Sequence, residues 1–316
     1  MSVNESVDYL NAGGVLSVGG SQVEVRRDQQ LMWVVVDGME SSCLDVRDPE
    51  HLVFEYMQQM DAAVNAVVPR PQPIRAVHLG GCACALACAW DAGRPGSTQV
   101  AAEINAELIP ILRELVGWPK APRLRVRAED AADTVRSLRP GRADVIVRDI
   151  FTRAATPRAF RTREFFTRCT DAVAAGGLLL VNAVHGGGED ARIDVAGMLA
   201  AGCEVAVIAE SATLAGGRRA NVVIVGLVGT SLAHGSATVT ESAPVWLELA
   251  RQLRRLPIAV RLLTGDDVTR WVGSTRAYVE DVVDADAART TRPAERADGT
   301  RAQHSPTASP QHRRRR

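Results

Sequence analysis

Seven short apolar runs, separated by amphipathic segments, follow one another between residues 74 and 228 and constrain the fold more than any other feature. Most of them are rich in Val, Ile and Leu. Strands of this composition are typical of a parallel sheet that helices cover on both faces. The runs are IRAVHLG, TQVAAEI, RLRVRAED, ADVIVRDI, GLLLVNAV, CEVAVIAE and NVVIVGLV, with helices expected near 83–92, 106–117, 131–138, 161–175 and 190–201. The pattern predicts an α/β fold.

The last two runs are joined by SATLAGGRRA, which leaves no room for a helix. We therefore expect them to pair as an antiparallel hairpin at one edge of the sheet. A seven-stranded sheet that ends in this way is typical of the Rossmann-like fold of class I methyltransferases. That analogy concerns the fold and says nothing by itself about function.

The N-terminal region, residues 1–68, is predicted to be a small β-rich subdomain followed by a linking helix. β-Branched runs between residues 21 and 46 are interrupted by Asp37-Gly38, which is a hairpin signal. Asp48 can cap the helix and Pro49 suits its first turn. The segment PRPQP at 69–73 ends it.

The Rossmann-like domain is predicted to span residues 69–232, and a helical extension residues 233–284. The extension contains two helix candidates, at 243–256 and 265–283. Residues 285–316 are mainly Arg, Ala, Thr, Pro, Ser and Asp, with almost no large apolar side chains. A segment of this kind cannot bury enough surface to fold, so we predict a disordered basic tail.

Composition and charge exclude several classes of protein. The formal net charge is +0, which gives no general reason to expect nucleic-acid binding. No apolar run approaches the ~20 residues of a membrane span, and the first residues lack the basic start and apolar core of a secretory signal. The sequence predicts a cytoplasmic protein with no membrane partner.

The six cysteines lie largely in apolar segments, which favours reduced, buried thiols over disulfides. Cys82, Cys84 and Cys88 fall within one short segment without a second cysteine pair, so we expect no metal site there. His78 is expected to be a buried, hydrogen-bonded residue. His185 precedes GGGED, which could form either a mobile substrate loop or an ordinary connection.

Polar groups and glycines follow the first four predicted strands. Ligands of open parallel sheets bind at the carboxyl ends of the strands, near the point where strand order reverses. Gly80 and Gly81 allow close approach of the backbone to a ligand, and an acid at the second strand end can accept both hydrogens of a ribose diol. The candidate adenosyl site comprises Gly80, Gly81, Glu103, Glu129, Asp130 and, as the group at the mouth of the sheet, Asp149.

From about Val34 to Val228 the sequence resembles the spermidine synthase (polyamine aminopropyltransferase) family. The resemblance rests on VVVDG, HLGG, VAAEIN, EDA, DVIVRDI, TREFF and GGLLLVN, in that order. It implies that Glu103 holds the ribose, that Asp130 and Ala131 hold the adenine, and that Asp149 is the catalytic base. It also implies decarboxylated S-adenosylmethionine as the co-substrate, and we expect a homodimer.

Transfer to an amine needs a general base, because the amine must lose a proton. An amine with a pKa near ~10.4 is mostly protonated at pH 7 and cannot attack in that form. A carboxylate within hydrogen-bond reach can take the proton as the amine attacks the carbon beside the sulfonium.

The departures from the family fall mainly on the acceptor side. The family's loop is Gly-Gly-Gly-Asp-Gly, whereas Cys82, Ala83 and Cys84 follow the two glycines here, and Ala83 removes a carboxylate. Its aspartate and proline after the catalytic aspartate become Thr152 and Arg153. Further differences are Ser41 for a glutamine, Glu55 and Tyr56 for a histidine and a glutamate, and an added Arg158. These changes predict a degenerate polyamine pocket.

Three functions remain open from the sequence. The first is an aminopropyltransferase that acts on an amine acceptor with decarboxylated S-adenosylmethionine. The second is a small-molecule methyltransferase that uses S-adenosylmethionine itself, which the loss of an acid at Ala83 would tolerate. The third is a non-catalytic adenosyl-binding or assembly module.

Overall fold

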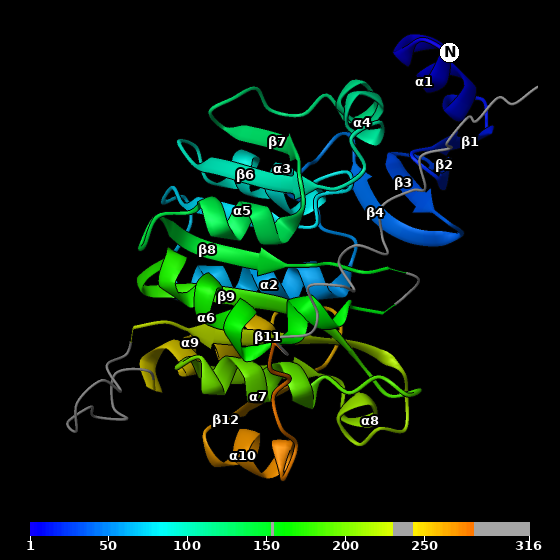
Figure 1. The fold of residues 1–316 in the computed structure, drawn as a ribbon. Helices are drawn as coiled ribbons and strands as arrows, with labels where there is room; N and C mark the ends of the chain where they lie inside the picture. The colour runs from blue at the N-terminus through cyan, green and yellow to red at the C-terminus, as the bar shows by residue number, and fades with distance from the viewer. Residues whose placement is uncertain (153–154, 230–242, 281–316) are drawn as a thin grey trace, which may run out of the picture. The chain divides into compact units, whose positions relative to one another are not determined.

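The computed structural model describes residues 1–152, 155–229 and 243–280 (Figure 1). The tail predicted at 285–316 and position Arg153 lie outside the described residues. In the part described, two sheets are present, a central one of eight strands and an N-terminal one of four.

The central sheet has the strand order β12-β10-β11-β9-β8-β5-β6-β7. Its strands are β5 (Arg75–Leu79), β6 (Thr98–Glu103), β7 (Leu124–Ala128), β8 (Ala143–Arg148), β9 (Val173–His185), β10 (Glu204–Ala209), β11 (Ala220–Leu227) and β12 (Arg261–Thr264). Strands β5 to β9 pair in parallel, whereas β11 is antiparallel to both of its neighbours. The seven predicted runs are therefore all confirmed as strands.

The eighth strand corrects the seven-stranded prediction. β12 pairs antiparallel with β10, so the hairpin of β10 and β11 is confirmed but does not form the edge of the sheet. Four residues between two helices are too few to show a periodic pattern, and only pairing with β10 makes them a strand. The linker between β10 and β11, expected to hold no helix, contains the single turn α8 (Ser211–Leu214).

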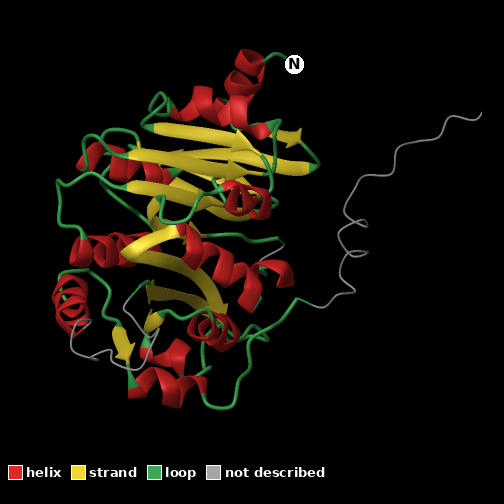
Figure 2. Ribbon diagram, turned by 60° about the vertical axis from the view of Figure 1, so that its left-hand side comes forward, coloured by secondary structure: helices red, strands yellow, loops and turns green. Residues whose placement is uncertain are grey.

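Helices cover both faces of the central sheet, as the sequence predicts. One apolar cluster joins the sheet to α2 (Glu55–Val67), α3 (Ala85–Gly93), α4 (Leu108–Val116) and α9 (Ala243–Leu253). The other joins it to α5 (Ala131–Ser137), α6 (Arg163–Ala172), α7 (Arg192–Ala200) and α10 (Asp266–Val272). Figure 2 shows these helices in red around the yellow strands.

The N-terminal sheet is a meander of β1 (Val15–Val18), β2 (Ser21–Asp28), β3 (Leu31–Val36) and β4 (Met39–Asp45). Asp37 and Gly38, at φ 51° and 78°, form the predicted turn between β3 and β4, and two positive φ values are what a type I′ hairpin turn requires. The helix α1 (Val3–Asn11), which was not predicted, precedes the sheet and begins with a capping box of Ser2 and Glu5.

The linking helix begins later than predicted. α2 starts at Glu55, and its N-cap is Phe54 rather than Asp48. The Asp45 carboxylate accepts the backbone N–H groups of Arg47 and Asp48, at 3.0 and 3.1 Å, and this holds the chain in a turn before the helix. The helix ends before PRPQP, as predicted.

The C-terminal extension is only partly helical. α9 forms within the first predicted helix, but the second, predicted over 265–283, is confined to α10 and ends at Gly273, which has a φ of 58°. Beyond it the chain lies against the start of α6, where the Arg163 N–H donates to the Tyr278 carbonyl at 2.8 Å. Within the described residues, every helix is too short or too polar to cross a membrane.

Candidate functional site

The predicted site residues lie at or just after the carboxyl ends of the parallel strands of the central sheet. β5 pairs in parallel with β6 on one side and β8 on the other, so strand order reverses at β5. The carboxyl ends of β5 to β8 point to the same edge because these strands are parallel. This edge, next to a reversal of strand order, is where open α/β sheets bind ligands.

Gly80, the first residue after β5, lies so close to the backbone of Asp149 that a side chain would not fit there. Its φ is 94°, and an added Cβ would lie 2.1 Å from the Asp149 carbonyl oxygen. The next residue, Gly81, has more room, since its Cβ would meet the Ala102 carbonyl at 3.4 Å. Gly80 therefore allows the loop after β5 to lie directly against the end of β8.

Gly80→Ala should destabilise the protein more than Gly96→Ala, which is a matched control. Gly96 has a similar φ of 91°, but its nearest neighbour would be a side-chain carbon of Pro73 at 3.7 Å. Both variants lose about 1–2 kcal/mol from the left-handed backbone, and Gly80→Ala loses a further ~1–3 kcal/mol from overpacking. Urea unfolding of the two variants measures the difference, and equal losses would contradict the close approach.

The loop after Gly81 keeps a glycine-like backbone without glycines. Cys82 and Cys84 have φ values of 40° and 58°, in the left-handed region that side chains other than glycine rarely adopt. They stand where the resembled family has glycines. The turn into α3 is therefore retained although its side chains have changed.

Glu103, the last residue of β6, is tied to this loop. Its Oε2 accepts the Cys82 N–H at 2.8 Å, and its Oε1 accepts the Asn105 N–H at 2.9 Å. An ionised carboxylate offers about four lone-pair sites, so two remain for a diol. The carboxylate is partly exposed, and its geometry suits the predicted contact with a ribose.

The residues predicted to hold an adenine lie at the end of β7. Asp130 caps α5, since its Oδ1 accepts the Ala132 N–H at 2.6 Å, which leaves Oδ2 for a ligand. Glu129 accepts the Thr134 hydroxyl at 2.6 Å and Arg127 at 3.2 Å. Ala131 is buried in the core. The hydrogen bonds of this group within the described residues are local to the start of α5, so its adenine role stays a prediction.

Asp149 is held by two residues that the sequence did not single out as site residues. The Tyr56 hydroxyl, from the first turn of α2, donates to Oδ2 at 2.8 Å. The Asn182 side-chain amide, from β9, donates to Oδ1 at 2.9 Å. The Asp149 backbone N–H donates to the Leu79 carbonyl at 2.8 Å. Three segments far apart in the sequence thus orient one carboxylate.

The local environment shifts the proton affinity of this group in opposing ways. Burial raises the pKa of the Asp149 carboxyl above its usual range, while the hydrogen bonds from Asn182 and Tyr56 and the charge of Arg148 oppose that rise. Burial and the neighbouring carboxylate together raise the pKa of Tyr56 well above its ordinary value. Tyr56 is therefore a stable hydrogen-bond donor to Asp149.

A sequence signal existed for one of these two partners. Asn182 is the single polar residue in the apolar run GLLLVNAV, and it is only 2% exposed. A lone amide in a buried strand needs a hydrogen-bond partner. Tyr56 gave no such signal, because at its position on α2 it fits the apolar face equally well.

Arg148 faces away from Asp149, because successive side chains along a strand point to opposite faces. It is fully buried and forms an ion pair with Asp194 of α7 at 2.8 Å. Arg161 pairs with the other oxygen of Asp194, also at 2.8 Å. The Arg148 guanidinium also donates to the Thr156 hydroxyl at 2.8 Å, so the network anchors the segment that follows Asp149.

The positions that depart from the family also have local explanations. Ala83 is fully buried, and its carbonyl accepts the Trp118 indole N–H at 2.9 Å. Thr152 forms a short bridge with Ala155. The guanidinium of Arg158 lies 4.3 Å from the centre of the Tyr278 ring, so its charge is placed over an aromatic face.

Cys84 and Cys88 are buried, and Cys82 is partly buried. Burial is the main cause that raises the pKa of Cys82 to about 12, helped by the nearby carboxylates of Glu103 and Asp149. The pKa of Cys88 is raised to about 12 by burial as well. The thiolate is the nucleophile and metal ligand, and the raised pKa values keep these thiols protonated at neutral pH. Among the described residues, no group of three His, Cys, Asp or Glu side chains could hold a metal.

His78 and His185, the two histidines considered from the sequence, make local structural contacts. His78 is buried, and its Nε2 lies 2.9 Å from the Gln99 amide oxygen, as expected of a hydrogen-bonded core histidine. Burial lowers its pKa to about 4, so it is neutral at pH 7. His185 accepts the Ala191 N–H at 3.3 Å, and Gly186 bridges to Glu189. These contacts favour an ordinary connection after β9.

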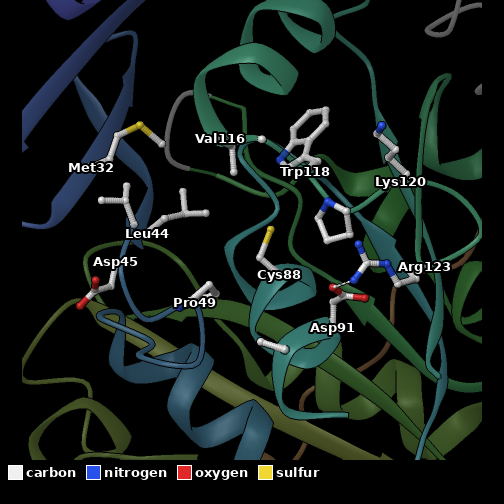
Figure 3. A pocket seen from close by; sticks show the side chains of 14 residues that line it. Met32, Leu44, Asp45, Pro49, Cys88, Asp91, Val116, Trp118, Lys120 and Arg123 are labelled. Carbon is white, nitrogen blue, oxygen red and sulfur yellow. Dashed lines mark hydrogen bonds and ion pairs between the residues drawn. The ribbon is translucent and has the colours of Figure 1, made fainter. Parts of the chain in front are cut away.

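A pocket of about 440 Å³ lies beside α3, away from the predicted site residues (Figure 3). Met32 and Leu44 of the N-terminal sheet line one side, and Trp118 lines another. Asp91 and Arg123 form an ion pair at its wall. The link to the loop after β5 is the hydrogen bond from Trp118 to Ala83.

No protein-family model and no curated protein matches this sequence, but solved structures do. A probable spermidine synthase from Corynebacterium glutamicum is similar with a TM-score of 0.73 and 29% identity, over 85% of this chain and 97% of that one. Spermidine synthase from Thermotoga maritima gives 0.46 and 14%, over 82% and 86%. Human methyltransferase-like protein 13, solved with SAH, gives 0.48 and 18%, over 74% and 99%.

The first of these similarities carries the argument, since it covers nearly the whole of the other protein. Proteins of this type are transferases, and the likeness supports a transferase here. The chain is therefore similar to a probable spermidine synthase over most of its length, and it has a class I methyltransferase-type fold.

Proposed function

We propose that the protein transfers an alkyl group from an adenosyl sulfonium donor to an amine, with Asp149 as the general base. The observation that carries the proposal is the carboxylate of Asp149, oriented by Tyr56 and Asn182 beside the Gly80 loop. A carboxylate whose pKa is raised by burial is suited to accept a proton at neutral pH.

The donor would lie across the loop after β5. Its adenosine would contact Glu103 through the ribose and Asp130 through the adenine, and its sulfonium would face Asp149. The donor is a cation, so the carboxylate also favours its binding. The donor would supply the electrophilic carbon, and the chain's residues would align the amine with that carbon and take up the proton.

The first form of the proposal is aminopropyl transfer from decarboxylated S-adenosylmethionine, supported by the likeness to a probable spermidine synthase. The second is methyl transfer from S-adenosylmethionine. The specific observation in its favour is Ala83, a fully buried residue that offers no charge to a donor's propylamine. A site without that acid would accept a donor that keeps its own carboxylate.

Thermal unfolding with adenosyl ligands tests this proposal. A ligand at about 1,000 times its Kd stabilises a protein by ~4 kcal/mol, which is on the order of 10 °C for a chain of this size. A shift with decarboxylated S-adenosylmethionine or methylthioadenosine alone supports aminopropyl transfer. A shift with S-adenosylmethionine and S-adenosylhomocysteine supports methyl transfer.

Glu103→Gln should abolish that shift, because an amide accepts fewer hydrogen bonds than a carboxylate and cannot satisfy the loop and a diol together. Glu114→Gln, an exposed position on α4, is the matched control and should leave the shift unchanged. If no adenosyl compound raises the melting temperature of the unmodified protein, the chain is not an adenosyl-dependent transferase.

A further inference from the structure

We propose that the acceptor is a monoamine with an aromatic or similarly flat apolar body. The inference rests on the proposed function and specifies its substrate class. Its nitrogen would lie at Asp149 and Asn182, and its body would lie along three aromatic side chains, Trp33, Phe54 and Tyr56, which we call the aromatic ladder.

The aromatic ladder leads from the N-terminal sheet to the catalytic carboxylate. The Trp33 ring on β3 meets the Phe54 ring edge to face, with their centres 5.7 Å apart. The Phe54 ring stacks on the Tyr56 ring at 5.8 Å and 21°. The Tyr56 hydroxyl then reaches Asp149. Trp33 and Phe54 are partly exposed residues, so they retain surface that an apolar body can cover, whereas the Tyr56 hydroxyl is buried against Asp149.

Where the substrate's nitrogen would bind, one hydrogen-bond acceptor, the amide oxygen of Asn182, has no donor among the described residues. The carboxylate of Asp149 can only accept, so the NH₂ group of Asn182 must face it and the amide oxygen must point elsewhere. That oxygen is buried and has no hydrogen-bond partner among the described residues. A buried acceptor without a donor is costly, and an ammonium or amine nitrogen bound at Asp149 has further N–H groups to give it.

At the ends of β6 to β8, the described carboxylates other than Asp149 are assigned to the donor or to local hydrogen bonds, so none of them is placed for a second cationic nitrogen. Of the described carboxylates near the loop, Glu103 already accepts two backbone N–H groups. Asp194 belongs to the buried network behind β8 and pairs with Arg148 and Arg161. Ala83 is neutral and buried. The rings of the ladder favour an apolar or aromatic surface next to a single positive charge, rather than a chain that is charged at both ends.

The transfer step follows from this placement. Asp149 takes the proton of the amine, and the nitrogen lone pair attacks the carbon attached to the sulfonium. The C–N bond forms as the C–S bond breaks, and sulfur keeps the electron pair as a neutral adenosyl thioether. The product is the alkylated amine, and no redox change occurs.

Turnover of a small panel of amines tests the inference. The purified full-length chain is supplied with decarboxylated S-adenosylmethionine or S-adenosylmethionine, and release of the adenosyl thioether is measured with phenethylamine, propylamine and putrescine. We expect kcat/KM for phenethylamine to exceed that for putrescine by about tenfold or more, the factor that one aromatic contact provides.

The two possible failures are distinguishable. Turnover of putrescine at least as fast as that of phenethylamine overturns the acceptor class and leaves the transferase function standing. Release of thioether with none of the amines, from either donor, overturns the transferase function and the acceptor class together.

Variants of the ladder separate recognition from folding. Trp33→Ala and Phe54→Ala should each raise KM for phenethylamine about tenfold with kcat nearly unchanged, and should lower kcat/KM for propylamine, which has no ring, by a smaller factor. Tyr9→Ala, at an exposed aromatic residue on α1, is the control and should change neither. Equal losses for phenethylamine and propylamine would mean that the ladder is only structural, and would overturn the inference.

Discussion

Asp149→Asn should lower turnover by about 10²–10⁴-fold, the contribution that a positioned general base makes. An amide cannot take the proton of an attacking amine, whereas the loop around Gly80 and the contacts of Glu103 do not depend on the charge of Asp149. We therefore expect the variant to keep the stabilisation by an adenosyl ligand while it loses turnover. Single-turnover kinetics and thermal unfolding on the same samples measure the two properties.

The pH profile adds a second readout for this residue. A carboxyl group acts as a base only when it is ionised, and burial raises the pKa of Asp149. Turnover of the unmodified protein should therefore rise with pH through that raised pKa, and the rise should be missing in Asp149→Asn. Asp144→Asn, on β8 itself, is the control, since its carboxylate pairs with Arg75. Normal turnover in Asp149→Asn would remove this residue from the reaction.

Asp194→Ala should destabilise the protein by about 3–5 kcal/mol, the usual cost of leaving a buried charge without its partner. Asp194 is 1% exposed and accepts from two arginines, of which Arg148 is fully buried. Its removal leaves the buried Arg148 guanidinium without a carboxylate in a region of low dielectric constant, while Arg161 keeps only its longer ion pair with Glu189, at 3.5 Å. Arg148 also holds Thr156, so the segment after Asp149 should loosen as well.

Denaturant unfolding at pH 7 checks this expectation against a pair at the surface. Glu210 and Arg218 form a partly exposed ion pair, and Glu210→Ala should change stability by no more than ~1 kcal/mol. A similar small loss for Asp194→Ala would show that water or another group replaces the missing partner. In that case the ion pairs of Asp194 with Arg148 and Arg161 would not stabilise the end of β8.

Much of the central sheet followed from the sequence because its strands are buried on both faces. A run such as ADVIVRDI is stable as an inner strand of a sheet that helices cover on both faces. β12 could not be predicted in this way, since RLLT is too short for a pattern and becomes a strand only beside β10. The length of α10 was overestimated because nothing local marked its end except Gly273.

Some features of the site followed from the sequence, and others only from the tertiary structure. The order of strands and the positions of Gly80, Glu103, Asp130 and Asp149 at their ends follow from the chain itself, because parallel strands bring their carboxyl ends to one edge. The partners of Asp149 do not. Tyr56 lies 93 residues and Asn182 lies 33 residues away from it in the chain. Hydrogen bonds over such separations depend on how helices pack and strands pair, and only the tertiary structure decided that an aromatic ladder would lead to this carboxylate.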